Sequence, residues 1–395
     1  MAIPAIHWKT NHPSNAEAAA LHADIDAGFL LPTRWYGDPA LFEVERKRIH
    51  QRAWHFATHM GDLTQSGDLY VRNIAGVPIV LVRDNEQNVR GFINICRHRG
   101  HPVVLESGNQ PKLRCHQHSW TYGLDGKLQQ APRSAGDPTF DMAQFGLVPI
   151  QTKVWGPMVW VNLDLSAPSF DRWVEGMPEW MREHGLRVED HVFGFDGSWD
   201  IDANWKVFQD NTIECYHCPS THPELARVLE MKPSLQKIAV GGRYWIHHTI
   251  PFRESFNGSL TTKRNPGVPF NYYYHWVFPS TYLQYSGRGF DIGSLDIIAV
   301  DKIRFRHICF MPRDTPAERL EQGRKQLAAD ATIHQDVVLC NAVQRGHAGG
   351  MAPTSRVLRE PEFLLSHFQH LIVDMMYERH STLFDDERRV SLRTV

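Results

Sequence analysis

The chain has 395 residues and a net charge of −2, and hydrophobic residues make up 42% of it. This length and composition predict two packed globular units. The near-neutral charge excludes the strongly basic surface that binds nucleic acid or an anionic membrane.

The sequence gives no sign of a secreted or membrane protein. It has no run of about 18 or more apolar residues that could span a membrane. Its first residues have neither a basic region nor an apolar core typical of a signal peptide. Six cysteines in a chain this long do not form a disulfide scaffold. We therefore expect a cytoplasmic protein.

The predicted elements begin with a helix over residues 39–57, where apolar residues recur at helical spacing. From about residue 60 to 165, short alternating apolar runs between turn residues predict the strands of a small antiparallel β domain. These runs are LYVRNIA, VPIVLVRD, VRGFINIC, KLRC, LVPIQTKV and PMVWVNLDL.

A second unit follows the segment 167–173. Its long strand-like stretches precede two helical ones, at about 316–346 and about 360–380, and this order predicts an α+β fold class. No glycine-rich dinucleotide motif follows a strand, so no nicotinamide or flavin site is expected. We predict three parts: an N-terminal extension with a helix that packs on the larger domain (1–58), the small β domain (59–166), and a larger domain whose antiparallel sheet is covered by helices (167–395).

Two pairs of cysteine and histidine lie within the small β domain. The first is Cys96-x-His98 and the second is Cys115-x-x-His118. Two thiolates can hold one iron of a [2Fe–2S] cluster while two imidazoles hold the other, as in a Rieske centre. The alternative is a structural zinc site, although a zinc finger usually keeps its cysteines together and its histidines together.

A second group of ligand-type residues lies in the larger domain, where Glu214, His217 and His222 are spaced E-x-x-H-x4-H. Residues three apart share a helix face, so Glu214 and His217 are predicted to point the same way. Pro219 is predicted to end that helix after Cys218, which lets His222 fold back from the following turn. Two histidines with one carboxylate form the ligand set of non-haem Fe(II) oxygenases.

Asp336 is the predicted carboxylate of that set. Its helical neighbours are apolar, and a carboxylate in such a setting needs a partner such as a metal ion. Asp330, Glu224 and Asp210 are the weaker alternatives. Without a metal, the same motif would consist of two structural histidines and a surface aspartate.

The stretch CRHRGHPVV…CHQHSWTYGLDGKL and the later NWKVFQDNTIECYHCPSTHPEL resemble Rieske non-haem iron oxygenases of the ring-hydroxylating family, over nearly the whole chain. The resemblance implies a catalytic α subunit in which residues 59–166 form the Rieske domain and 167–395 the catalytic domain. It implies a [2Fe–2S] cluster bound by Cys96, His98, Cys115 and His118. It also implies a mononuclear Fe(II) bound by His217, His222 and Asp336.

The same resemblance implies how electrons arrive. Glu214 takes the place of a catalytic bridging carboxylate that connects His217 with His118 of a neighbouring subunit. The family is trimeric, either as a homotrimer or as α3β3 with a β subunit. Electrons come from an NAD(P)H-dependent flavin and iron–sulfur reductase, with or without a ferredoxin.

The sequence ECYHC…HPEL resembles that of the branch of the family that oxidises quaternary amines such as choline, glycine betaine or carnitine. A hydroxylating or demethylating monooxygenase is therefore expected. The alternatives are a cis-dihydroxylating aromatic-ring dioxygenase and, from another class, a Rieske electron-transfer protein without oxygenase activity. Sequence alone leaves the exact substrate open.

Further residues of this domain have two interpretations each. The aromatic run from Tyr272 to Phe278 could form a cage for a cation, or could pack in the core. Cys215 and Cys218 are interpreted as packing around His217 and not as a zinc or redox pair. The candidates for binding a substrate carboxylate are Arg243, Arg253 and Arg288.

Overall fold

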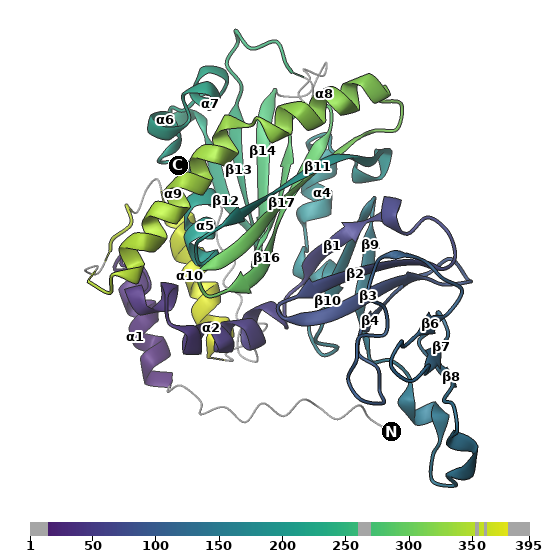
Figure 1. Ribbon diagram of the computed structural model, residues 1–395. Helices are drawn as coiled ribbons and strands as arrows, with labels where there is room; N and C mark the ends of the chain where they lie inside the picture. Colours follow the sequence, from purple (N-terminus) through teal and green to yellow (C-terminus); the bar gives the residue numbers. More distant parts are fainter. Residues whose placement is uncertain (1–14, 260–269, 352–354, 359–361, 378–395) are drawn as a thin grey trace.

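A computed structural model describes residues 15–259, 270–351, 355–358 and 362–377 (Figure 1). Its strands form two seven-stranded sheets and one three-stranded sheet, and the strand pairs within them are antiparallel. Helices gather around one of the large sheets. The α+β fold class, with a small β part and a larger sheet covered by helices, is confirmed.

The first large sheet contains all but one of the strand runs predicted between residues 60 and 165. Its order is β1-β10-β9-β4-β3-β2-β5, with bounds His55–His59 (β1), Asp68–Ile74 (β2), Val77–Arg83 (β3), Val89–Ile93 (β4), Gly108–Asn109 (β5), Pro149–Trp155 (β9) and Met158–Asn162 (β10). The small sheet, which holds the remaining run, consists of β6 (Leu113–Arg114), β7 (Thr121–Tyr122) and β8 (Leu128–Gln130). The boundary predicted after residue 58 falls inside β1, which pairs with β10.

The second large sheet has the order β11-β17-β16-β15-β14-β13-β12. Its strands are β11 (His191–Ile201), β12 (Lys237–Gly242), β13 (Trp245–Pro251), β14 (Asn271–Val277), β15 (Thr281–Tyr285), β16 (Phe290–Ala299) and β17 (Lys302–Pro312). The five inner strands match predicted stretches, whereas β11 and β12 were missed. Both are edge strands with glycine and polar residues, so their burial does not alternate cleanly.

The helices have the bounds Asn15–Asp26 (α1), Pro39–Glu45 (α2), Phe170–Trp173 (α3), Met177–Glu183 (α4), Trp205–Thr212 (α5), Cys218–Thr221 (α6), Pro223–Val228 (α7), Ala317–Ala328 (α8), Ala331–Ala348 (α9) and Phe363–Met376 (α10). In Figure 1, α8 and α9 cross in front of the second large sheet, and α1 lies beside α10. No helix in the described ranges has both the length and the apolar character needed to cross a membrane.

Two helix predictions are corrected. The helix expected over about 316–346 is two helices, because the carboxylate of Asp330 caps α9 by accepting a hydrogen bond from the backbone N–H of Ile333 at 3.1 Å. The helix expected over 39–57 ends after a π-helical turn at His50, since residues from His55 onwards pair with β10. Part of the helix expected over 360–380 lies outside the described residues, and the rest is α10.

The start of α5 is held by a fully buried ion pair. Lys206 Nζ lies 2.6 Å from Glu45 Oε1, and both side chains are completely enclosed. Trp205 Nε1 also donates to Glu45 Oε2 at 2.9 Å. Removing one partner of such a pair leaves an uncompensated buried charge. The pair therefore ties α2 to the helix that leads into the predicted iron motif.

Candidate metal centres and the adjoining cavity

The loop after β4 and the loop between β6 and β7 have the same backbone form. The N–H of Gly100 donates to the carbonyl of Cys96, and the N–H of Ser119 donates to the carbonyl of Cys115, both at 3.0 Å. Each cysteine N–H in turn donates to the carbonyl five residues further on, at 2.8 and 2.9 Å. Gly100 and Ser119 both have positive φ, at 79° and 59°. Each predicted pair of cluster ligands thus lies on one of two matched turns.

The side chains on these loops separate into a buried thiol pair and an exposed imidazole pair. Cys96 and Cys115 are 3% and 1% exposed and contact each other, while His98 and His118 are exposed. The two imidazole rings meet edge to face, with centroids 4.6 Å apart. Two adjacent thiols beneath two adjacent imidazoles are the donors that a Rieske [2Fe–2S] cluster requires, so these residues fit that group.

Two aromatic residues support this arrangement. The hydroxyl of Tyr122 lies 3.3 Å from Cys96 Sγ and accepts a hydrogen bond from the backbone N–H of Arg97 at 3.0 Å. Burial raises the pKa of Tyr122, so its hydroxyl stays protonated and can donate toward the sulfur. The ring of Trp120 stacks on His98 at 4.9 Å. Together they fix one thiol and one imidazole.

The segment with the second motif differs from its prediction in backbone form. Helix α5 ends at Thr212, so Glu214 and His217 lie in a loop and do not share a helix face. Pro219 lies in the first turn of α6, which begins at Cys218, and does not end a helix. Proline is accommodated at a helix start because the N–H it lacks has no partner there in any case.

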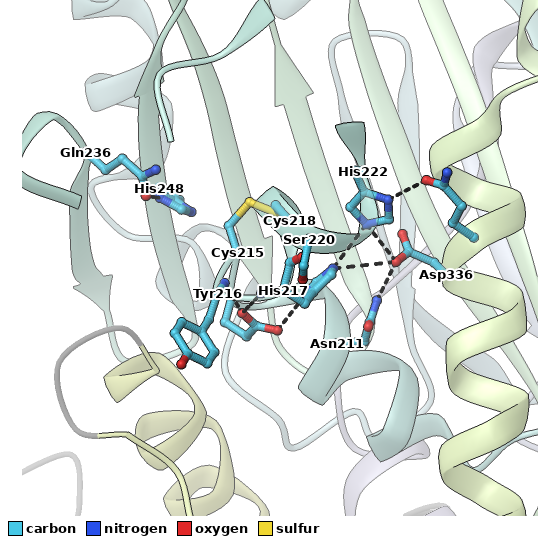
Figure 2. The surroundings of a disulfide bond; sticks show 12 residues. Asn211, Cys215, Tyr216, His217, Cys218, Ser220, His222, Gln236, His248 and Asp336 are labelled. Atoms are coloured by element: carbon cyan, nitrogen blue, oxygen red, sulfur yellow. Dashed lines mark hydrogen bonds and ion pairs between the residues drawn. A yellow bond between two sulfur atoms is a disulfide. The ribbon is translucent and has the colours of Figure 1, made fainter. Parts of the chain in front are cut away.

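The structure nevertheless brings His217, His222 and Asp336 together (Figure 2). His217 Nε2 lies 3.1 Å from His222 Nε2. Oδ1 of Asp336, on α9, lies 3.2 Å from His222 Nε2 and 3.6 Å from His217 Nε2. Three ligand atoms from two distant segments therefore face one point.

The outer nitrogens of both imidazoles are held by oxygen atoms. His217 Nδ1 lies 2.5 Å from Glu214 Oε1, and His222 Nδ1 lies 2.7 Å from Gln335 Oε1. Carboxylate and amide oxygens accept hydrogen bonds, so in the neutral, metal-binding form of each ring Nδ1 carries the proton and Nε2 offers its lone pair to the metal. This is the usual support of metal-binding histidines, and the residues fit a mononuclear Fe(II).

The charges around the point also favour a cation. Burial lowers the pKa of His217, but hydrogen bonds to Asp336 and Glu214 outweigh it and raise this pKa to about 9. Asn211 Nδ2 donates to Asp336 Oδ1 at 2.8 Å and orients the carboxylate. The predictions did not include Asn211 or Gln335, whose only sequence signal is that they are amides near the motif residues.

The three rival carboxylates lie elsewhere. Asp330 caps α9. Glu224 is exposed on α7, 3.8 Å from Arg227. Asp210 is partly buried and accepts a hydrogen bond from the hydroxyl of Tyr36 at 2.7 Å. Among the four candidate aspartates and glutamates, Asp336 is thus the one that the fold places at the histidine pair.

Cys215 and Cys218 bracket His217, as predicted, but they form a disulfide bond (Figure 2). From the sequence, these cysteines were not interpreted as a redox pair, whereas in the structure they are bonded to each other. Cys218 Sγ lies within 4.8 Å of the imidazole nitrogens of His217 and His222. Because the metal ligand form of cysteine is the thiolate, this bonded sulfur does not complete a zinc site.

A cavity of about 420 Å³ adjoins the histidine pair. One row of its lining runs straight across the second large sheet through directly paired residues: His248, Tyr274, Gln284, Asp291, Cys309 and Phe195. The opposite wall includes residues of α8, α9 and the loop with His217. Directly paired residues in an antiparallel sheet project from the same face, which explains why this row lines one wall.

The lining is aromatic and acidic. It includes the rings of Phe195, Phe208, Tyr272, Tyr274, Tyr282 and Phe305 and the carboxylates of Glu214, Asp291, Asp330 and Asp336. Among the described residues that line it, none is lysine or arginine. The candidate clamps are outside this lining: Arg243 lies 3.4 Å from Asp374, Arg253 lies 3.5 Å from Glu230, and Arg288 is likewise absent from the lining.

The fold and the two sites define a class of protein that combines a Rieske-type cluster site with a mononuclear metal site. Comparison with known families agrees. The family described as "Rieske [2Fe-2S] domain" matches residues 53–145, and "Ring hydroxylating alpha subunit (catalytic domain)" matches residues 177–378. The chain therefore belongs to the ring-hydroxylating α-subunit family, whose members bind a Rieske cluster and a mononuclear iron.

Individual relatives extend this finding. The oxygenase subunit of glycine betaine monooxygenase from Pseudomonas aeruginosa is 34% identical over 218 residues, which are 55% of this chain and 50% of the relative. This match thus spans about half the relative's length. The oxygenase subunit of carnitine monooxygenase from Acinetobacter baumannii is 26% identical over 369 residues, covering 89% of this chain and 95% of the relative.

The fold also matches a solved structure. It is that of a quaternary ammonium Rieske monooxygenase, described with insights into carnitine oxidation by gut microbiota and inter-subunit electron transfer. The match has a TM-score of 0.79 and 22% identity and covers 90% of this chain and 97% of that chain. At that identity the comparison establishes the fold alone.

Proposed function

We propose that the chain is the terminal oxygenase component of a Rieske-type system that hydroxylates or demethylates a small quaternary amine. The observation that carries this proposal is the cavity beside His217, His222 and Asp336. Its described lining combines aromatic rings with carboxylates and has no lysine or arginine. Aromatic faces attract quaternary ammonium groups, and carboxylates add favourable charge. An anionic aromatic acid would find no lysine or arginine among these residues.

We assign the cluster to Cys96, His98, Cys115 and His118, and the mononuclear iron to His217, His222 and Asp336. When bound, the cluster supplies one-electron transfer and the Fe(II) supplies O2 chemistry. The protein positions these groups: Glu214 and Gln335 hold the two imidazoles in one tautomer, and Asn211 orients the carboxylate of Asp336.

Electron transfer between subunits is part of the proposal. In Figure 1 the β6–β7 loop, which holds one ligand pair, and α6, beside the predicted iron site, lie on opposite sides of the molecule. A neighbouring subunit would shorten that route by bringing its own His118 to Glu214, next to the exposed ring of Tyr216. This arrangement supports a homotrimer, or α3β3 with a β subunit.

The remaining partners are proposed from the family alone. A separate NAD(P)H-dependent flavin and iron–sulfur reductase, with or without a ferredoxin, would supply the electrons. The cytoplasmic location and the domain limits at residues 58 and 166 stay predictions.

The reaction can be tested in a single turnover. The purified holoprotein is reduced with dithionite, freed of excess reductant, and exposed to O2 with choline, glycine betaine, carnitine or naphthalene. We expect a hydroxylated or demethylated product, detected by mass spectrometry, from at least one of the three quaternary amines and none from naphthalene. A diol from naphthalene with no product from any quaternary amine would contradict the proposal.

A further inference from the structure

Three side chains on the sheet wall of the cavity form a second group with metal-ligand chemistry. Asp291 on β16 is directly paired with Cys309 on β17, and His307 lies two residues along β17 from Cys309. Side chains two residues apart on a strand share a face. A carboxylate oxygen, a ring nitrogen and the sulfur accordingly lie within 4.8 Å of one another.

Asp291 lacks a strong partner within this group. Its Oδ2 lies 3.8 Å from His307 Nε2, which is beyond hydrogen-bond distance. The side chain of His307 is 9% exposed, and its Nδ1 is buried without a hydrogen-bond partner. In the described part of the chain, no lysine or arginine forms an ion pair with Asp291. A partly buried carboxylate without a cation is costly, so this position calls for a positively charged ligand.

Two tyrosine rings complete the surroundings. A Cβ at Gly293 would lie 2.0 Å from Cζ of Tyr282, so only glycine lets this ring lie flat over β16. The ring of Tyr274 stacks beside it, with centroids 5.1 Å apart. Burial, then the neighbouring Tyr274 and Tyr272, and after them the charges of Asp291 and Asp336 raise the pKa of Tyr282. The ring therefore stays neutral and lies within the field of both carboxylates.

We propose that Asp291 determines specificity by binding the ammonium group of the substrate against the ring faces of Tyr274 and Tyr282. This inference rests on the proposed function and deepens it. Asp291 is on the sheet wall and Asp336 is on the helix wall, so a substrate held by Asp291 reaches across the cavity toward the iron ligands. The other three carboxylates of the lining already have partners. Asp336 and Glu214 contact the histidines, and Asp330 caps α9.

A metal ion is the competing occupant of this group. A metal would need the Cys309 thiolate. Burial and then the nearby Asp291 charge raise the pKa of Cys309 well above its usual range, which keeps the sulfur as a thiol that donates to the carboxylate. The geometry therefore favours an organic cation, whose partners are the carboxylate and the rings.

The test compares cations with neutral-carbon isosteres of the same shape. Choline is paired with 3,3-dimethylbutan-1-ol, and glycine betaine with 3,3-dimethylbutanoate, so that only the charge of one atom differs within each pair. Binding to anaerobic holoprotein is measured by titration calorimetry for the wild type and three variants. The variants are Asp291→Asn, the charge-keeping Asp291→Glu, and Glu224→Gln as a control, since Glu224 is an exposed carboxylate outside the cavity lining.

We expect the wild type to prefer at least one cation over its isostere by about tenfold or more, and Asp291→Asn to lose most of that preference. Asp291→Glu and Glu224→Gln should each stay within about threefold of the wild type. A preference that persists in Asp291→Asn would overturn the role of Asp291 while leaving the proposed function intact. No preference in the wild type would instead contradict the cationic substrate class. A further tightly bound metal, present in the wild type and lost in Asp291→Asn, would overturn the inference in favour of a metal site.

Discussion

The two metal centres of this chain are built in opposite ways. The proposed cluster ligands lie on two short loops, each closed by its own backbone hydrogen bonds around a residue of positive φ. The proposed iron ligands come from a loop and a helix that are remote in sequence: Gln335, which holds His222, is 113 residues away from it. The first centre depends on local turn geometry, whereas the second exists only when α9 packs beside the loop. Substitutions should therefore affect the two centres separately.

Asp336→Asn should give the largest difference between the two centres, because an amide replaces the carboxylate that completes the iron ligand set. Turnover should fall by more than about 100-fold, beyond the usual effect of losing a residue that only supports a ligand. The visible spectrum of the cluster should not change. Glu224→Gln, at an exposed carboxylate outside the cavity lining, should keep both turnover and spectrum. Unchanged turnover in Asp336→Asn would contradict the assignment of Asp336 to the iron.

Removing a residue that only supports a ligand should have a smaller effect. Gln335→Ala and Asn211→Ala should each weaken Fe(II) binding by about 10- to 100-fold, since the His222 ring or the Asp336 carboxylate loses its orientation. The iron content of dialysed protein, measured against added Fe(II), checks this. The [2Fe–2S] content serves as the internal control. Equal loss of cluster and iron would mean that the variants damage the whole fold and not one site.

The third prediction concerns α5, the helix that leads into the iron-site loop. Burial raises the pKa of Asp210 from 3.8 to about 7, despite the hydrogen bond from Tyr36. Between these two values the unfolded chain releases a proton that the folded chain keeps, so this residue makes the protein less stable as pH rises. From pH 5 to 7 the contribution is about 2 kcal/mol.

Asp210→Asn keeps an oxygen for the hydroxyl of Tyr36 but does not titrate. The free energy of unfolding of the variant should therefore increase relative to that of the wild type as pH rises from 5 to 7. Denaturant unfolding at several pH values measures it. A constant difference over this range would show that Asp210 is ionised in the folded protein.

The smallest effects are expected within the cluster loops, where a matched pair of substitutions tests their common geometry. Gly100→Ala places a side chain at φ 79° and should destabilise the protein by about 1 kcal/mol. Ser119→Gly should relieve a similar strain. The gain in stability is reduced because Ser119 Oγ no longer accepts an exposed hydrogen bond from Arg114. Thermal unfolding followed by the cluster absorbance measures both. Opposite signs for the two variants support matched loops, and equal signs contradict them.

This contrast also explains how much the sequence could predict. The four cluster ligands were predicted because their spacing reflects two local turns. Asp336 was predicted from its apolar helical neighbours, and the fold places it at the histidines. The loop form of Glu214 and His217 was missed, because helical spacing cannot tell a helix from a loop that a side-chain hydrogen bond closes. The positions of Asn211 and Gln335 beside the iron site depend on which elements pack together. The row through Asp291 depends on which strands pair. Local sequence spacing carries no information on either.

The most direct test of the central claim is the content of iron, zinc and acid-labile sulfide per chain in protein purified without added metal. Two separate centres predict about three irons and two sulfides per chain, with a Rieske-type visible spectrum. In Asp336→Asn the value should fall to about two irons with the sulfide unchanged. Zinc without sulfide would contradict both centres.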